Sequence, residues 1–403
     1  MTEISPELIS ACVHCGFCLP TCPTYGPLWQ EEMDSPRGRI RLMAGLIDGT
    51  VPLTDTTVEH FDRCLGCMAC VTSCPSGVQY DRLIEQTRAY VEERYEREPA
   101  DWLLRKAIFA LFPYPRRLRA ALLLAPLGRV LPLPGRLGAL AELAPPWRSA
   151  GRPAELTRSD GEPASRGGLV TGCVQSVVFG DVNAATARVL AADGYEVDAP
   201  AGQACCGALH LHAGRRDEGK RRARALGEQF ERAGVDTLVV NAAGCGSHLK
   251  DAGLGLRVVD VSELLAEAGP KAERKPLPLR VAFQDSCHLL HAQRVHDAPR
   301  DVLDAIPSLD RLEPAEQAIC CGSAGIYNLV EPEAARELGD RKAAHVLASE
   351  PDVYASANPG CLVQVSAGLR RAQRPLPAVH PIELVDASIR GIAADDLLAA
   401  ARR

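Results

Sequence analysis

The second half of the chain alternates short apolar runs with longer amphipathic stretches. Residues 168–173 and 237–241 are apolar runs of the length typical of buried strands. From about 183 to 193 and from about 216 to 233, apolar residues recur at helical spacing, and a glycine follows each stretch. The pattern predicts alternating strands and helices, an arrangement that packs as parallel sheets covered by helices.

The same order recurs further along the chain. Residues 279–283 and 352–356 repeat the apolar runs, and residues 333–348 repeat the second helical stretch. Four cysteine positions recur as well, each about 115 residues further along the chain. We therefore expect two copies of one α/β unit, repeat 1 over residues 167–275 and repeat 2 over residues 276–393. The matching cysteines are Cys173 and Cys287, Cys205 and Cys320, Cys206 and Cys321, and Cys245 and Cys361.

The other eight cysteines lie before residue 80, in two runs with the spacing C-x2-C-x2-C-x3-C-P. This spacing is that of bacterial ferredoxins with two [4Fe–4S] cubes, in which the fourth cysteine of each run ligates the other cube. Two zinc knuckles are the alternative, but the x3 gap followed by Pro23 and Pro75 favours the ferredoxin turn. The expected ligands are Cys12, Cys15, Cys18 and Cys74 for one cube, and Cys64, Cys67, Cys70 and Cys22 for the second.

These patterns together predict an α+β multidomain protein. Residues 1–98 form an α-helical domain for two cubes, and two α/β repeats with parallel sheets follow. Between them, residues 99–166 have a different character. No Asp or Glu occurs from residue 102 to residue 141, where basic residues alternate with apolar ones and prolines divide the segment. This basic segment is expected either to pack on its own protein as a strap, followed by a flexible linker, or to lie on an anionic membrane surface.

Each repeat contains two adjacent cysteines followed by a glycine. Adjacent cysteines are poor disulfide partners, and Gly207 and Gly322 let the backbone approach a bulky cofactor closely. The repeated cysteines, Cys173, Cys205, Cys206 and Cys245 with their counterparts in repeat 2, therefore suggest a further iron–sulfur site or a redox dithiol in each repeat. Buried cysteines kept only for packing are the alternative.

Composition and charge exclude several classes of function. The net charge of −6 gives no cationic field for nucleic acid, and no apolar run approaches the roughly 18–20 residues that cross a bilayer. The first residues have no apolar signal segment, so we expect a cytoplasmic protein. No strand followed by G-x-G-x-x-G, P-loop, HExxH or G-x-S-x-G pattern is present, so no catalytic residue is assigned.

The chain has two ferredoxin-type cysteine runs, followed by two repeats that each contain the sequence Cys-Cys-Gly (CCG). In this order of parts it resembles the iron–sulfur subunits of glycolate oxidase and of anaerobic glycerol-3-phosphate dehydrogenase. The repeats themselves also resemble heterodisulfide reductase subunits. Local sequence similarity favours the glycolate oxidase subunit. The stretches that carry this preference are residues 11–18, 21–25, 35–40, 184–190 and 320–325.

The resemblance implies a function in electron transfer. Such a subunit takes electrons from separate FAD-containing subunits that oxidise glycolate to glyoxylate, and passes them toward a membrane acceptor of the quinone type. It then works on the inner face of the cell membrane without crossing it. The alternative is the corresponding subunit of anaerobic glycerol-3-phosphate dehydrogenase or of a complex that oxidises lactate-type 2-hydroxy acids.

One departure from the resemblance concerns the end of each repeat. Heterodisulfide reductase repeats end in C-x2-C and use five thiolates for a noncubane cluster. Here the last position is His248 in repeat 1 and Gln364 in repeat 2, so a five-thiolate cluster cannot form unchanged. Four cysteines, with or without His248, remain able to hold iron, and cluster occupancy of the repeats stays open.

Overall fold

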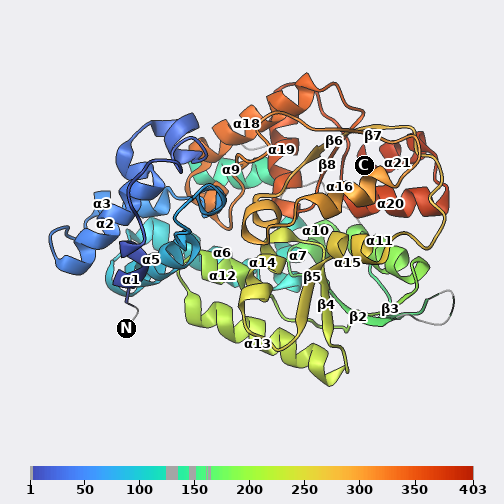
Figure 1. Cartoon of the computed structure of the whole chain (residues 1–403), viewed down its shortest axis with the longest axis horizontal. Helices are drawn as coiled ribbons and strands as arrows, with labels where there is room; N and C mark the ends of the chain where they lie inside the picture. Colours follow the sequence, from blue (N-terminus) through green and yellow to red (C-terminus); the bar gives the residue numbers. More distant parts are fainter. Residues whose placement is uncertain (1–2, 124–134, 145–150, 160, 162–164, 403) are drawn as a thin grey trace.

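The computed structural model describes residues 3–123, 135–144, 151–159, 161 and 165–402. A helical N-terminal region lies at one end of the molecule, and the two α/β repeats form the rest (Figure 1). Parts of the expected strap and linker, residues 124–134, 145–150 and 162–164, lie outside the described residues. No helix of the described ranges is both long and apolar enough to cross a membrane.

The N-terminal region consists of short helices with cysteine loops between them. Ser5, Ser35 and Thr54 cap three of the helices by accepting a backbone hydrogen bond, which is why those helices begin there. Met43, Phe61 and Leu83 are almost fully buried in the core that the helices share. The elements are α1 (Pro6–Ser10), η1 (Thr24–Trp29), η2 (Glu32–Asp34), α2 (Pro36–Asp48), α3 (Asp55–Asp62), α4 (Ala69–Thr72) and α5 (Tyr80–Arg94).

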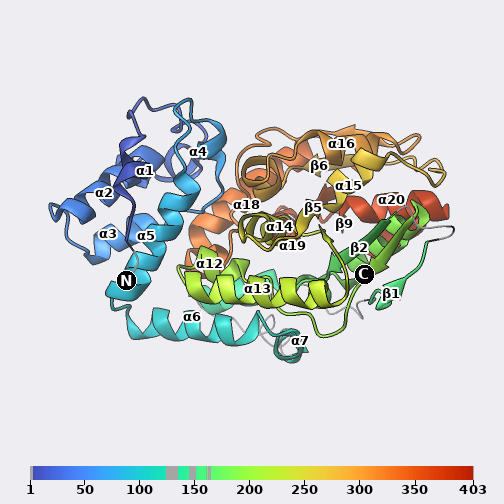
Figure 2. The ribbon, with the colours of Figure 1, turned by 60° about the horizontal axis from the view of Figure 1, so that its bottom comes forward.

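Within its described residues, the basic segment connects this region to the repeats through the helices α6 (Pro99–Leu111), α7 (Pro115–Leu123) and α9 (Gly135–Leu143). Helix α6 runs from the end of α5 toward α7 along one side of the molecule (Figure 2). Its inner face buries Ile108 and Phe109 against Ala213 of repeat 1 and against Ile326 and Leu329 of repeat 2. One helix therefore contacts both repeats.

Each repeat contains a parallel sheet, and the strand order is the same in both. The order is β3-β2-β4-β5 in repeat 1 and β7-β6-β8-β9 in repeat 2, and β1 adds an antiparallel strand beside β3. The strands are β1 (Leu156–Thr157), β2 (Ser165–Val170), β3 (Tyr195–Asp198), β4 (Thr237–Val240), β5 (Arg257–Asp260), β6 (Arg280–Gln284), β7 (Asp310–Leu312), β8 (Val353–Ser356) and β9 (Ala378–Val379).

The expected fold class, a helical dicluster region before two duplicated α/β repeats, is confirmed. The predicted strands and helices occur within a few residues of their expected bounds. Strands β1, β3, β5, β7 and β9 were not predicted, because they are only two to four residues long; β1 lies where a flexible linker was expected, and β5 and β7 begin with charged side chains. The expected domain boundaries stay a prediction.

The two repeats share one hydrophobic core. Helices α11 (Gly180–Ala192) and α15 (Val261–Ala268) of repeat 1 pack against α20 (Pro381–Arg390) and α16 (Asp297–Asp304) of repeat 2. The outer faces are covered by α13 (Arg216–Arg232) in repeat 1, and by α18 (Pro332–Ala348) and α19 (Pro359–Arg371) in repeat 2. The remaining helices are α10 (Gln175–Val178), α12 (Ala208–His212), α14 (Ala243–Asp251), η3 (His288–Ala292), α17 (Tyr327–Val330) and α21 (Ala394–Arg402).

A buried ion pair fixes the connection between the repeats. Asp193, at the end of α11, is fully buried and accepts hydrogen bonds from the backbone N–H groups of Lys271 and Ala272 and from Arg274. The Arg274 side chain is only 6% exposed. Removing Asp193 would leave a buried guanidinium without its charge partner, which is strongly destabilising.

We expect Asp193→Ala to lower the free energy of unfolding by about 3–5 kcal/mol. The measurement is urea unfolding of the anaerobically purified protein, followed by circular dichroism. The matched control is Asp297→Ala, because the Asp297 side chain is 86% exposed beside His296. Equal unfolding midpoints for the two variants would contradict the structural role of Asp193.

Candidate metal centres

The two cysteine runs of the N-terminal region fold into the same loop. The third and fifth residues of each run have left-handed backbone angles, at His14 and Gly16 in the first run and at Gly66 and Met68 in the second. Glycine adopts this conformation at little cost, whereas His14 and Met68 are strained in it. The glycine is the fifth residue of the first run but the third residue of the second. The sequence therefore does not show that the two loops share one geometry.

Each loop borders a hollow lined by four of the expected ligands. The first hollow, of about 420 Å³, is lined by Cys12, Cys15, Cys18 and Cys74. The second, of about 310 Å³, is lined by Cys22, Cys64, Cys67 and Cys70. Cys70 and Tyr80 border both hollows, so the two adjoin.

This grouping is the one that exchanged fourth cysteines require, since Cys74 lies with the first run and Cys22 with the second. Each hollow is lined by the four thiols that a [4Fe–4S] cube needs, and Cys70 of the second set also borders the first hollow. In the described residues, no three His, Cys, Asp or Glu side chains converge closely enough to hold a single metal ion.

Hydrogen bonds reach the sulfur atoms from the surrounding chain. The Gly66 N–H lies 3.4 Å from Cys64 Sγ, and the Val78 N–H lies 3.5 Å from Cys74 Sγ. The Thr24 hydroxyl lies 3.2 Å from Cys22 Sγ. Such hydrogen bonds, together with burial, set the reduction potential of an iron–sulfur cluster. Burial raises the pKa of the Cys67 and Cys70 thiols, so cluster assembly must remove protons from them.

A buried arginine stands beside the second hollow. Arg39 is 1% exposed, lines the hollow and donates hydrogen bonds to the Thr24 hydroxyl, to Asp34 and to the His60 carbonyl. Burial by itself lowers the pKa of Arg39, but neighbouring Cys64 and Tyr80 outweigh it and raise that pKa above its ordinary value. The guanidinium therefore keeps its charge next to the thiolates. The sequence contained Arg39 within a recognisable stretch, but gave no sign of this role.

Arg88 and two histidines join the second loop to the repeats. Arg88 donates hydrogen bonds to the backbone carbonyls of Cys64 and His212. The rings of His212 and His288 meet edge to face, with centroids 4.8 Å apart, and His288 Nε2 donates to the Gly66 carbonyl at 3.1 Å. Burial lowers the pKa of His288 to about 4, so this histidine is neutral at pH 7. The N-terminal region, repeat 1 and repeat 2 thus meet at one point.

The repeat cysteines gather beyond the carboxyl ends of their sheets, in loops and, for Cys245 and Cys361, in the first turns of α14 and α19. In repeat 1, the sulfur atoms of Cys173 and Cys205 lie 3.3 Å apart, and those of Cys206 and Cys245 lie 3.1 Å apart. In repeat 2, the sulfur atoms of Cys287 and Cys320 lie 4.0 Å apart, and Cys321 interacts with Cys361. All four cysteines of each repeat are therefore neighbours in space.

The residues that replace the fifth cysteine have a structural role in both repeats. A side chain at Gly207 would meet the carbonyl of Gly219, and one at Gly322 would meet the carbonyl of Ala335. His248 Nε2 lies 3.4 Å from that same Gly219 carbonyl. In repeat 2, Gln364 donates to the Ala335 carbonyl at 2.7 Å. The nitrogen atoms of both side chains thus bind the carbonyl on which the CCG glycine packs.

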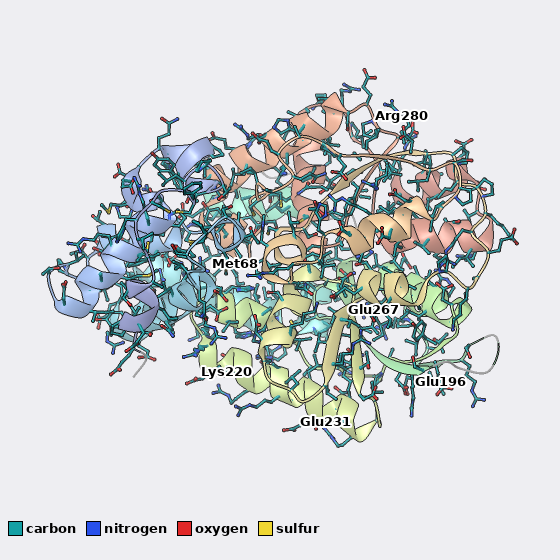
Figure 3. All side chains as sticks on the ribbon, viewed as in Figure 1. Met68, Glu196, Lys220, Glu231, Glu267 and Arg280 are labelled. Atoms are coloured by element: carbon teal, nitrogen blue, oxygen red, sulfur yellow. The ribbon has the colours of Figure 1, made fainter. Side chains whose placement is uncertain are left out.

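The repeats differ in their distance from the cubes. Cys67 of the second hollow shares a buried cluster with Cys320 of repeat 2, and Cys287 packs against that cluster. Figure 3 shows Met68, the neighbour of Cys67, where the N-terminal region meets the repeats. We propose that the second cube lies next to the cysteines of repeat 2. Whether the repeat cysteines hold a cluster stays a proposal.

Comparison with known proteins agrees with this organisation. Residues 8–78 match the family described as "4Fe-4S dicluster domain", and residues 168–250 and 281–366 match the family described as "Cysteine-rich domain". The chain is 34% identical to the "Probable glycolate oxidase iron-sulfur subunit" of Bacillus subtilis, over 94% of this chain and 93% of that protein. It is also 34% identical to the "Glycolate oxidase iron-sulfur subunit" of Escherichia coli, over 95% of each.

A solved structure of similar fold is that of a hypothetical protein from Helicobacter pylori. Its TM-score is 0.58 at 8% sequence identity, and the match covers 90% of this chain and 69% of that one. The similarity extends to the fold alone.

We propose the exchanged ligand sets for the two cubes, and cysteine variants test them. Cys22→Ser should lower the iron content from about eight to about four per chain, because only one cube keeps all its ligands. The electron paramagnetic resonance spectrum of the remaining cube should match that of Cys67→Ser and differ from that of Cys15→Ser. A spectrum matching that of Cys15→Ser would show that each run binds its own cube.

Proposed function

Because the chain belongs to the family of glycolate oxidase iron–sulfur subunits, we propose that it carries electrons for the oxidation of glycolate to glyoxylate. Separate FAD-containing subunits perform that oxidation, and the two cubes carry the electrons away toward a quinone-type acceptor. The single observation that supports this proposal best is the pair of adjoining four-thiol hollows, the second of which packs against repeat 2.

The arrangement suits electron transfer rather than substrate chemistry. The [4Fe–4S] cubes supply one-electron chemistry when bound. The cysteines would hold them in adjoining hollows, with the buried Arg39 beside the second. A cation beside a cluster would favour its more negative, reduced form, and the Asp34 carboxylate, which pairs with Arg39 at 3.2 Å, would offset part of that effect.

The proposed function predicts which components are needed for reduction. Anaerobically purified protein should contain at least about eight irons with matching sulfide, at four per cube, and more if the repeats hold iron. Glycolate should reduce the cubes only when the FAD-containing subunits are added, whereas dithionite should reduce them directly. The measurement is optical and paramagnetic resonance spectroscopy, with glycerol 3-phosphate and lactate as control substrates. Glycolate oxidation by this chain alone, or zinc in place of iron and sulfide, would overturn the proposal.

The outer face of α6 and α7 supports a further proposal, that the protein rests on the inner face of the membrane. Trp102, Leu103 and Leu123 are between 52% and 61% exposed. Lys106 stacks on the Trp102 ring at 4.4 Å, and Arg116 and Arg117 are exposed nearby. Exposed apolar and basic side chains without acidic neighbours suit the interface of an anionic bilayer.

Vesicle binding tests this membrane contact. The protein should sediment with vesicles that contain phosphatidylglycerol and bind less to vesicles of phosphatidylcholine, because the basic side chains need anionic head groups. Replacing Trp102 and Leu103 together by serine should weaken sedimentation several-fold. Leu156→Ser, at another exposed leucine, is the control. Equal binding by wild type and the double variant would contradict the contact and leave α6 as a strap on its own protein.

A further inference from the structure

The two most exposed large apolar side chains of the described residues flank the first cube loop. Val13 and Phe17 are each 67% exposed. Between them lies Cys15, which alone among the sixteen cysteines is exposed. Folding normally removes large apolar side chains from water, and those that stay exposed together mark interaction surfaces. The exposure of Val13 and Phe17 therefore indicates a surface that binds a partner.

The exposed side chains lie at the mouth of the first hollow. Val13 and Phe17 line it together with Cys12, Cys15 and the exposed residue Pro75 of the second run. The cube proposed for this hollow thus lies directly behind them. We call the surface formed by Val13, Phe17 and Pro75 the docking face.

The docking face carries no charged side chain. No Asp, Glu, Lys or Arg occurs in residues 8–30 or in residues 64–80, which together supply the loops around both hollows. The nearest charge in the hollow wall, Arg37, pairs with Glu32 at 2.6 Å and donates a hydrogen bond to the His14 carbonyl at 3.2 Å. Arg37 therefore supports the loop rather than presenting a free charge.

An uncharged face with an aromatic anchor fits a protein partner. The centres of protein interfaces are depleted of charged residues and enriched in aromatic ones. An anionic membrane would require basic side chains, which the docking face lacks, whereas Lys106, Arg116 and Arg117 are exposed on α6 and α7. The two surfaces therefore suit different partners.

The way each hollow is covered indicates which partner binds the docking face. The second hollow is closed by repeat 2, since Leu65, Cys67 and Ala69 are buried against Cys320, Tyr327 and Leu338. The first hollow is bordered instead by the exposed residues Val13, Cys15 and Phe17, which do not belong to that buried cluster. Electrons that arrive from another polypeptide therefore reach the first cube most directly.

We propose that the docking face binds the FAD-containing subunit and admits its electrons to the first cube. This inference rests on the proposed function. Each glycolate oxidised gives two electrons and two protons to the flavin of the partner. The electrons cross the docking face one at a time, each reducing the first cube by one electron, and pass on to the second. The protons leave to solvent from the partner, and no covalent bond forms between the subunits.

A charge placed on the docking face tests the proposal. Phe17→Glu should slow glycolate-driven reduction of the cubes by about tenfold or more at limiting concentrations of the FAD-containing subunits, because it buries a carboxylate at the centre of the interface. Higher partner concentrations should restore part of the rate. Reduction by dithionite and an iron content of about eight should be unchanged. The matched control is Ile47→Glu, since Ile47 is an exposed apolar residue on α2.

The possible outcomes separate the two proposals. If glycolate and the FAD-containing subunits fail to reduce the wild-type cubes, the proposed function is overturned. If they reduce the wild type and Phe17→Glu equally fast, the docking face is wrong and the function stands. Should Phe17→Glu lose iron, Phe17→Ser replaces it, because it removes the aromatic side chain without adding charge. A full rate with iron-loaded Phe17→Ser and with Val13→Glu would then reject the docking face.

Discussion

The structure depends on bringing two distant cysteine runs to two adjoining hollows. Cys74 of the second run lines the first hollow, and Cys22 of the first run lines the second, as the proposed exchange of fourth ligands requires. The exchange requires α2 and α5 to hold the loops at a fixed distance, and the buried core around Met43 and Leu83 provides that support. The strained backbone of His14 and Met68 persists because the surrounding structure determines the loop completely.

The N-terminal region and the two repeats meet beside the second hollow. Arg88 and His288 bind the backbone of its loop, and Cys67 packs beside Cys320. The two repeats have the same strand order. Among the described residues, however, only repeat 2 contributes cysteines to the buried cluster beside this hollow. Duplication therefore produced two similar scaffolds with unequal positions relative to the cubes.

The departures at His248 and Gln364 show how the repeats compensate for a missing cysteine. Both side chains bind the helix carbonyl that lies against the CCG glycine. The close approach of loop and helix is therefore kept, although the fifth thiolate is absent. A cluster in these repeats would have four thiolates at most from the repeated positions, and the short sulfur–sulfur distances in repeat 1 equally suit a dithiol.

The sequence by itself determined the parts of this protein that depend on local spacing. Cysteine spacing identified both cube loops and the duplication, and apolar periodicity located β2, β4, β6, β8 and the long helices. It missed the short strands β1, β3, β5, β7 and β9, whose stability comes from neighbouring strands rather than from their own residues. Only the tertiary structure decided that Arg39 is buried beside the second hollow, that repeat 2 closes that hollow and that Phe17 remains exposed over the first. These features join residues far apart in the chain, and no local pattern records such contacts.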